Sequence, residues 1–237
     1  MDFTHDELIE ALRQTYGIIA KLDKALAGLS KTAKPQRTLA ERRIKALRIA
    51  QTLMLERAGA TLYEMGKQDQ WGAVLSAWKS DQKLGQWCAH YAKPTSGWTF
   101  LHQAAFFGNE PVIKELIRFG ASTVLQAKDG LAPVDVASSR GNESAAMVLT
   151  HATQGIGPLW AAPGDWLTLP SSCLWGEASP RRASQDMSVS YGGGVVHIRE
   201  GDAYFVDSFD RILVGWHGTY DPPRGMDTES MIDDHDD

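Results

Sequence analysis

The residues that decide the fold occupy positions 96–121 and read SGWTFLHQAAFFGNEPVIKELIRFGA. Thr99 can cap the start of a helix, because its hydroxyl accepts a hydrogen bond from the first turn. The alanine pair that begins at Ala104 is small enough to let a second helix approach closely. Gly108 and Gly120 can take the left-handed backbone conformation that ends helices. We therefore expect two short helices joined by a glycine turn.

A second segment with a similar pattern follows, and its Ala132 stands 33 positions after Thr99. Both segments resemble the ankyrin repeat, a helix pair with a period of about 33 residues. In the first segment the residues that carry the resemblance are Thr99, Leu101, His102, Ala104, Ala105, Gly108, Val112, Leu116, Ile117, Gly120 and Ala121, with Phe100 in place of the usual proline. In the second segment they are Ala132, Pro133, Val134 and Ala137.

The resemblance implies a role for the histidine of the first segment and a different one for the second segment. His102 in this frame ties a repeat to its neighbour through hydrogen bonds. The second segment has Asp135 in place of the histidine and lacks the final Gly-Ala, so we expect it to close the stack. An ankyrin stack is a platform for binding and carries no chemistry of its own.

Composition limits the classes of protein to consider. The chain has 237 residues, of which 43% are hydrophobic and 22% charged, as is usual for a globular protein. No run reaches the roughly 18 apolar residues of a membrane helix, and the first residues do not resemble a signal peptide, so we expect a cytoplasmic protein without a membrane partner. Cys88 and Cys173 are too few for a disulfide framework or a thiolate zinc site. The net charge of −5 weighs against nucleic acid as a partner.

The N-terminal third predicts two long amphipathic helices. Apolar residues recur at steps of three and four over residues 4–29 and again over 38–67, and the polar residues 30–37 between them, which include Pro35, predict a loop. Thr38 with Glu41 has the form of a helix cap. The two helices should fold back on each other as an antiparallel hairpin, which leaves self-association through the hairpin open.

The predicted hairpin tip is strongly basic. It holds Lys31, Lys34, Arg37, Arg42, Arg43, Lys45 and Arg48, with Glu41 as the acidic exception. Three interpretations remain: a solvated helix face, a site for a polyanion or acidic protein surface, and a patch shielded by the acidic residues that follow Asp227. No aromatic residue stands among the cations to stack on bases, which weakens the nucleic-acid interpretation.

Residues 68–94 predict two short helices that we interpret as an N-terminal cap of the ankyrin stack. An end repeat would otherwise expose its apolar side, and we expect the core of this cap to be filled by Trp71, Trp78 and Trp87. Cys88 lies in an aromatic-rich helix, which favours a small buried side chain over a nucleophile.

After His151 the pattern changes to a connector rich in glycine, proline and tryptophan, and then to short strands. We expect Trp160, Trp166 and Trp175 to fix the connector to the ankyrin surface. Alternation then predicts strands at 187–191, 195–198, 203–207 and 211–217, which would form a β meander docked on the connector and the last repeat.

The predicted fold class is therefore mostly α with a small β appendage, an α+β arrangement. We expect four parts: an antiparallel helical hairpin over 1–67, ankyrin repeats with their cap over 68–152, the tryptophan-rich connector with a small antiparallel β meander over 153–220, and an acidic, disordered tail over 221–237.

The β region also holds side chains that could form a catalytic or metal-binding site. Cys173 with His197 or His217 could form a thiol–imidazole pair or part of a metal site, although no two of these residues share a recognised ligand spacing. Three glycines from Gly192 to Gly194 could cradle a phosphate, but the β-branched residues that follow predict a strand. We keep an enzyme or metal site around the cysteine and the two histidines as an alternative function, and expect no cofactor.

The favoured function is a non-catalytic, scaffold-like module that binds a partner protein through the turn tips and the concave helix face. The residues expected at that surface are Trp98, Thr99, Phe100, Phe106, Asp129 and Leu131. Two interpretations of Trp98 remain open: an anchor for the partner, or packing against the helical hairpin. Polyanion binding by the basic hairpin tip is a further alternative.

Overall fold

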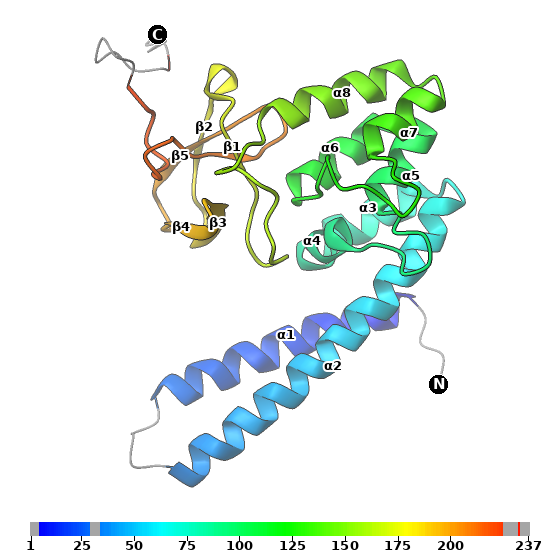
Figure 1. Ribbon diagram of the computed structural model, residues 1–237. Coiled ribbons are helices and arrows are strands. Elements are labelled where there is room, and N and C mark those ends of the chain that lie inside the picture. The colour runs from blue at the N-terminus through cyan, green and yellow to red at the C-terminus, as the bar shows by residue number, and fades with distance from the viewer. Residues whose placement is uncertain (1–4, 29–33, 225–231, 233–237) are drawn as a thin grey trace. The chain divides into compact units, whose positions relative to one another are not determined.

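A computed structural model describes residues 5–28, 34–224 and 232 of the chain (Figure 1). The described residues form eight α-helices, followed by short strands near the C-terminus. The predicted fold class, mostly α with a small β appendage, is confirmed. The chain divides into two compact units, Met1–Leu84 and Gly85–Asp237. The predicted acidic tail lies, apart from 221–224 and 232, outside the described residues.

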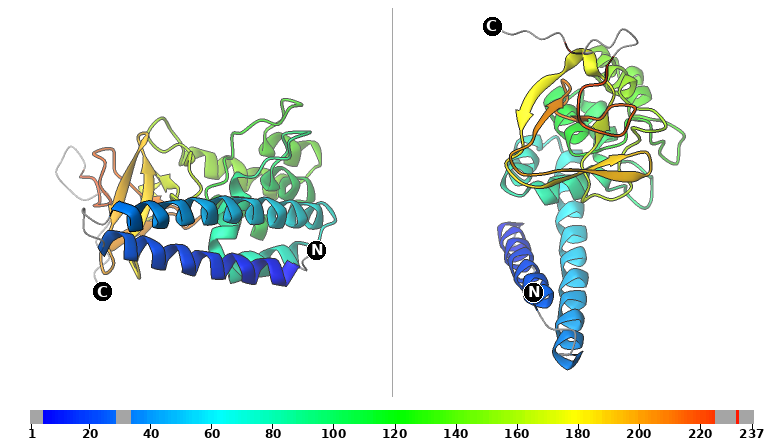
Figure 2. Two further views of the ribbon diagram at one scale, coloured as in Figure 1. Left: turned by 90° about the horizontal axis from the view of Figure 1, so that it is seen from below. Right: turned by 90° about the vertical axis from the view of Figure 1, so that its left-hand side faces the viewer.

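Two long helices dominate the first unit. Helix α1 (His5–Gly28) runs antiparallel to α2 (Lys34–Lys67), as the two views of Figure 2 also show. Leu12 and Ile44 are buried in the hairpin, and further along α2 Leu55 and Leu62 are buried as well. The predicted loop at 30–37 was too long, because α2 begins at Lys34. Pro35 lies in the first helical turn, where a proline is tolerated.

Two shorter helices follow, α3 (Trp71–Ser80) and α4 (Gln82–His90). Asp81 stands between them and starts α4, because its Oδ1 accepts hydrogen bonds from the backbone N–H groups of Lys83 and Leu84. Trp71 and Trp78 are buried, with 3% and 0% of their surface exposed.

The two predicted repeats form two helix pairs. The first repeat consists of α5 (Phe100–Phe107) and α6 (Glu110–Arg118), and the second of α7 (Pro133–Ser139) and α8 (Glu143–Gln154). Helix α5 lies beside α7, and α6 beside α8, so equivalent helices stack on one another (Figure 1). Gly108 ends α5 in the left-handed conformation at φ 67°, as predicted.

The β region forms two sheets. Strands β1 (Ser171–Ser172), β6 (Ile212–Leu213), β5 (Ala203–Val206) and β2 (Ser179–Arg182) make one sheet in that order, and β3 (Met187–Tyr191) with β4 (Gly194–Ile198) makes the other. A single 3₁₀ turn, η1 (Trp175–Glu177), lies between β1 and β2. The predicted meander was wrong in its topology: β5 pairs with β2 and β6 rather than with β4, and β1 pairs with β6 in parallel.

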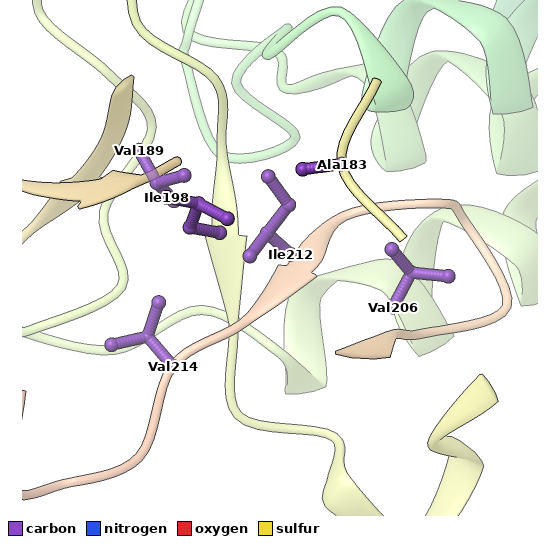
Figure 3. Packing of buried hydrophobic residues seen from close by; sticks show 6 residues of the cluster. All are labelled: Ala183, Val189, Ile198, Val206, Ile212 and Val214. Carbon is purple, nitrogen blue, oxygen red and sulfur yellow. The ribbon is translucent and has the colours of Figure 1, made fainter. Parts of the chain in front are cut away.

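Apolar residues from both sheets share one small core. Figure 3 shows Val189 and Ile198 of the β3–β4 hairpin facing Ile212 of β6, with three further residues around them. Trp160 of the connector packs on this core, and its indole Nε1–H donates to the carbonyl of Val214 at 2.7 Å. Trp160 therefore fixes the connector to the β core.

A buried arginine, paired with an aspartate of the β region, joins that region to the last repeat helix. Arg211 donates from Nε to Asp207 Oδ2 at 2.8 Å and from Nη1 to the carbonyl of Ala152 at 2.8 Å. The two charged side chains are 3% and 0% exposed. Because Ala152 lies in the last turn of α8, the contact docks the β region on the second repeat, as the sequence predicted.

Candidate functional site

The turns that precede the two repeats are bonded to each other. We call them the first tip (residues 96–98) and the second tip (residues 128–131). The backbone N–H of Lys128 donates to the carbonyl of Ser96 at 2.9 Å, and Trp98 Nε1–H donates to Asp129 Oδ2 at 3.0 Å. Gly97 permits the approach, because a Cβ there would meet the Lys128 nitrogen at 3.0 Å. The two tips therefore form one preorganised ridge.

Asp129 is held by both of its carboxylate oxygens. Oδ2 accepts from Trp98, and Oδ1 accepts from the backbone N–H of Leu131 at 3.1 Å. The hydrogen bond from the Trp98 indole, followed by that from the Leu131 backbone, holds the pKa of Asp129 below its ordinary value. The carboxylate thus stays ionised while it fixes the indole in place.

His102 links the two repeats from a fully buried position. Its Nδ1 accepts from the backbone N–H of Thr99, so Nε2 carries the proton and donates to the carbonyl of Leu131 at 3.0 Å. Burial lowers the pKa of His102, which favours this neutral form. The predicted tie between neighbouring repeats is confirmed.

The second repeat replaces this link with a local cap. Asp135 Oδ2 accepts from the backbone N–H of Ala132 at 2.9 Å at the start of α7. Its side chain thus satisfies the helix terminus without reaching another repeat.

Beside the ridge lies a cluster of partly exposed aromatic rings. These are the rings of Trp98, Phe106 and Phe107, and together with Asp129, Leu131 and Arg140 we call them the tip surface. Trp98 and Phe106 meet edge to face at 6.2 Å between ring centroids, and Phe106 meets Phe107 in the same manner at 5.3 Å. The guanidinium of Arg140, at the end of α7, lies 4.2 Å from the Phe106 centroid. The tip surface thus joins elements of both repeats.

Two of the predicted partner-binding residues do not belong to this surface. Thr99 is 4% exposed and Phe100 is 0% exposed. Thr99 accepts at its Oγ1 from the backbone N–H of His102, and Phe100 packs edge-on against Tyr91 at 6.0 Å between centroids. Their assignment to the binding surface is corrected, because one caps α5 and the other fills the core.

Of the other predicted residues, Trp98, Phe106, Asp129 and Leu131 are brought together, and the structure adds two that the sequence analysis missed. Phe107 is 37% exposed, and Arg140 covers the face of Phe106. Trp98 packs on His102 and Phe106, at centroid distances of 5.7 and 6.2 Å. Arg140 could have been found from its position directly before Gly141, the equivalent of Phe107 before Gly108.

The residues considered for catalysis or metal binding are not brought together. The Cys173 thiol contacts the carbonyl of Gln154, and burial raises its pKa. His197 Nδ1 pairs with the hydroxyl of Ser188, and His217 Nδ1 with that of Thr219. Within residues 5–28, 34–224 and 232, no group of three or more His, Cys, Asp or Glu side chains could hold a metal ion.

The glycines considered for phosphate binding form the hairpin turn between β3 and β4. Gly192 and Gly193 take φ values of 58° and 77°, and Tyr191 pairs with Gly194 across the turn. This pattern matches a two-residue hairpin turn, which requires positive φ at both central positions.

The basic hairpin tip borders a groove between α1 and α2. Arg42, Arg43 and Lys45 are exposed, and Arg48 pairs with Asp23 at 3.3 Å. The groove has a volume of about 520 Å³, and Leu26, Ile44 and Ile49 supply its apolar lining. The side chains of Lys31, Lys34 and Arg37 lie outside the described residues, and polyanion binding stays a prediction.

Residues 96–130 match the family model of the ankyrin repeat. The match covers the first repeat, the first tip and residues 128–130 of the second tip, and it confirms the resemblance seen in the first segment of the sequence. Ankyrin repeats are a family of protein–protein interaction modules and are generally not enzymes. Among the described helices, none is both long enough and apolar enough to span a membrane.

Proposed function

We propose that the protein binds a partner protein through the tip surface formed by Trp98, Phe106, Phe107, Asp129, Leu131 and Arg140. The observation that carries the proposal is the exposure of aromatic rings that meet edge to face on a segment that matches the ankyrin repeat. Tryptophan, tyrosine and arginine are the residue types that contribute most at protein interfaces.

The bonded tips support this assignment, because association costs less when a surface does not have to be ordered on binding. Lys128 is held by its backbone N–H and also by its Nζ, which donates to the carbonyl of Pro94 at 2.6 Å. The indole of Trp98 is held at both its polar edge and its ring face. A partner would therefore meet side chains that already occupy their binding positions.

The surface also defines which contacts a partner can make. The Asp129 carboxylate and the Trp98 indole N–H satisfy each other, so the ring faces of Phe106 and Phe107 and the guanidinium of Arg140 provide the remaining contacts. An apolar or aromatic side chain of the partner, flanked by a carboxylate that reaches Arg140, fits this arrangement.

The test is recovery of a partner from an extract of the native organism, identified by mass spectrometry. Phe106→Ala should lose the partner, whereas Met147→Ala, on the exposed face of α8 with 67% of Met147 accessible, should retain it. With the purified partner, truncation of a central aromatic should cost about 2 kcal/mol or more of binding free energy. Equal recovery by both variants, with unchanged circular dichroism, would show that the tip surface is not the binding site.

A further inference from the structure

Helix α2 carries a second apolar stripe outside the hairpin. Leu39, Ile49 and Leu53 are 53%, 54% and 60% exposed, and the small exposed Ala46 lies among them. At 3.6 residues per turn these residues fall within about 80° of one another, on the side of α2 opposite the buried Ile44. Helix α2 is therefore apolar on two faces, and we call the exposed one the outer stripe.

The spacing of the outer stripe is that of a helix–helix seam. Leu39, Ala46 and Leu53 are seven residues apart, and Ile49 stands three residues after Ala46 and four before Leu53. Such a heptad pattern pairs one helix with another. Ile49 also lines the groove of about 520 Å³ between α1 and α2, so the exposed apolar surface continues into that groove.

The charges beside the stripe determine which direction a second helix can take. Arg42 and Glu56 are exposed and lie seven residues before and after Ile49, about 10.5 Å along the helix in each direction and on nearly the same face. Within the part of the chain that the structure describes, neither side chain has an ion-pair partner.

We propose that a second copy of this chain covers the outer stripe, with the two α2 helices antiparallel and crossing at Ile49. The crossing places Arg42 beside the partner's Glu56, and the two-fold symmetry repeats this pair on the other side of Ile49. A parallel arrangement would instead place Arg42, Arg43 and Lys45 next to the same cations of the partner, which repel each other. The two hairpins together form a four-helix bundle that buries both faces of α2.

The experiment is sedimentation analysis of the full chain over a range of concentrations, with circular dichroism as a check on helix content. The wild-type protein should form a dimer. Ile49→Glu should weaken the dimer by about tenfold or more, because it places a charge at the centre of the seam. Met147→Glu is the matched control on the exposed face of α8 and should leave the dimer unchanged, because Met147 is 67% exposed and lies outside the stripe.

Charge reversal tests the direction of the helices. Arg42→Glu and Glu56→Arg should each weaken the dimer roughly threefold to tenfold, and the double variant should restore it, because the exchanged charges again face each other. A wild-type chain that remains monomeric would overturn the proposal, and failure of the double variant to restore the dimer would overturn the antiparallel pairing. Tight heparin binding by a wild-type monomer, lost in Arg42→Glu and not restored in the double variant, would assign these cations to a polyanion instead.

Discussion

The two repeats share one pattern, yet they differ in how much of each is buried. Ile113 and Ile117 of α6 are 0% and 1% exposed, whereas their equivalents 33 positions later in α8 are Ala146 and Thr150. Next to them in α8, Met147 is 67% exposed. The comparison teaches that the two units can form the same helix pair although the side chains of the second helix differ. Those side chains are apolar and buried where the unit lies inside the stack, and small or polar where it lies at the end.

The difference extends to the way each repeat is held. The first repeat reaches forward through His102 to the carbonyl of Leu131. The second repeat makes no such link through Asp135, and the β region instead reaches back through Arg211 to the carbonyl of Ala152. The β region thus takes the place of a further repeat.

The largest effect should come from the core of the first repeat. Phe100→Ala removes a fully buried ring and should lower the free energy of unfolding of this unit by about 3 to 5 kcal/mol. In the second repeat the equivalent of Phe100 is Pro133, and the next residue, Val134, is half-buried. Val134→Ala should lower the free energy of unfolding by about 1 kcal/mol. Hydrogen exchange of the α5 and α7 amides measures both costs, and equal costs would contradict an inside-and-end arrangement.

Removing the arginine that holds the end repeat should have the next largest effect. Arg211→Met leaves the buried Asp207 without its counterion, which should cost about 3 kcal/mol. Denaturant unfolding followed by tryptophan fluorescence measures this cost, and an unchanged free energy of unfolding would contradict it.

The helix caps made by His102 and Asp135 should differ in their contribution to stability. His102→Ala removes both the cap of α5 and the bond between repeats, and we expect a cost of about 2 kcal/mol. Asp135→Ala removes a local cap alone and should cost about 1 kcal/mol. If thermal unfolding shows the same cost for both, the bond from His102 to Leu131 contributes nothing to stability.

The glycines of the two tips provide a smaller contrast. Gly97 and Gly130 both have positive φ, at 75° and 81°, but a Cβ at Gly97 would meet the backbone of Lys128 while the space at Gly130 is open. Gly130→Ala should cost about 1 kcal/mol from its backbone conformation alone, and Gly97→Ala should cost more. Thermal unfolding of the two variants measures the difference, and a larger cost at Gly130 would contradict the close approach of the tips.

The smallest effect should be a dependence on pH that arises in the first repeat. The pKa of His102 in the folded protein lies below its ordinary value of 6.5. As the pH falls, the unfolded chain therefore takes up a proton on this histidine before the folded protein does. The contribution of neutral His102 to stability is complete above pH 6.5 and is lost as the pH falls toward the pKa of the folded protein. As the pH is lowered from neutral through this range, the midpoint of thermal unfolding of the wild-type protein should fall. The midpoint of His102→Asn, measured against its own value at neutral pH, should fall less.

Residue patterns predicted the helices well because their information is local. The first repeat was recognised in part from Thr99 and Gly108, which act locally as the caps at the two ends of α5. Strands β1 and β2 were missed, since two serines and the sequence Ser-Pro-Arg-Arg show no apolar alternation, and β1 pairs with a strand some 40 residues away. Pairing of this kind depends on the assembled core rather than on local pattern.

The residues of the candidate site also divide into those predicted from local pattern and those that depend on packing between distant parts of the chain. Trp98, Phe106, Asp129 and Leu131 follow from their places in the repeat. The burial of Phe100 depends on Tyr91, which lies before the repeat, and the role of Arg140 depends on the stacking of α7 beside α5. Neither packing relation can be derived from one repeat alone.

The contact between Arg211 and the carbonyl of Ala152 spans 59 residues, while that between His102 and Leu131 spans 29. Since contacts between residues distant in the chain close more slowly, the repeats should assemble before the β region does. During refolding, the C-terminal end of α8 therefore remains unprotected until Arg211 is in place, and during synthesis that helix end stays uncovered until Arg211 has left the ribosome.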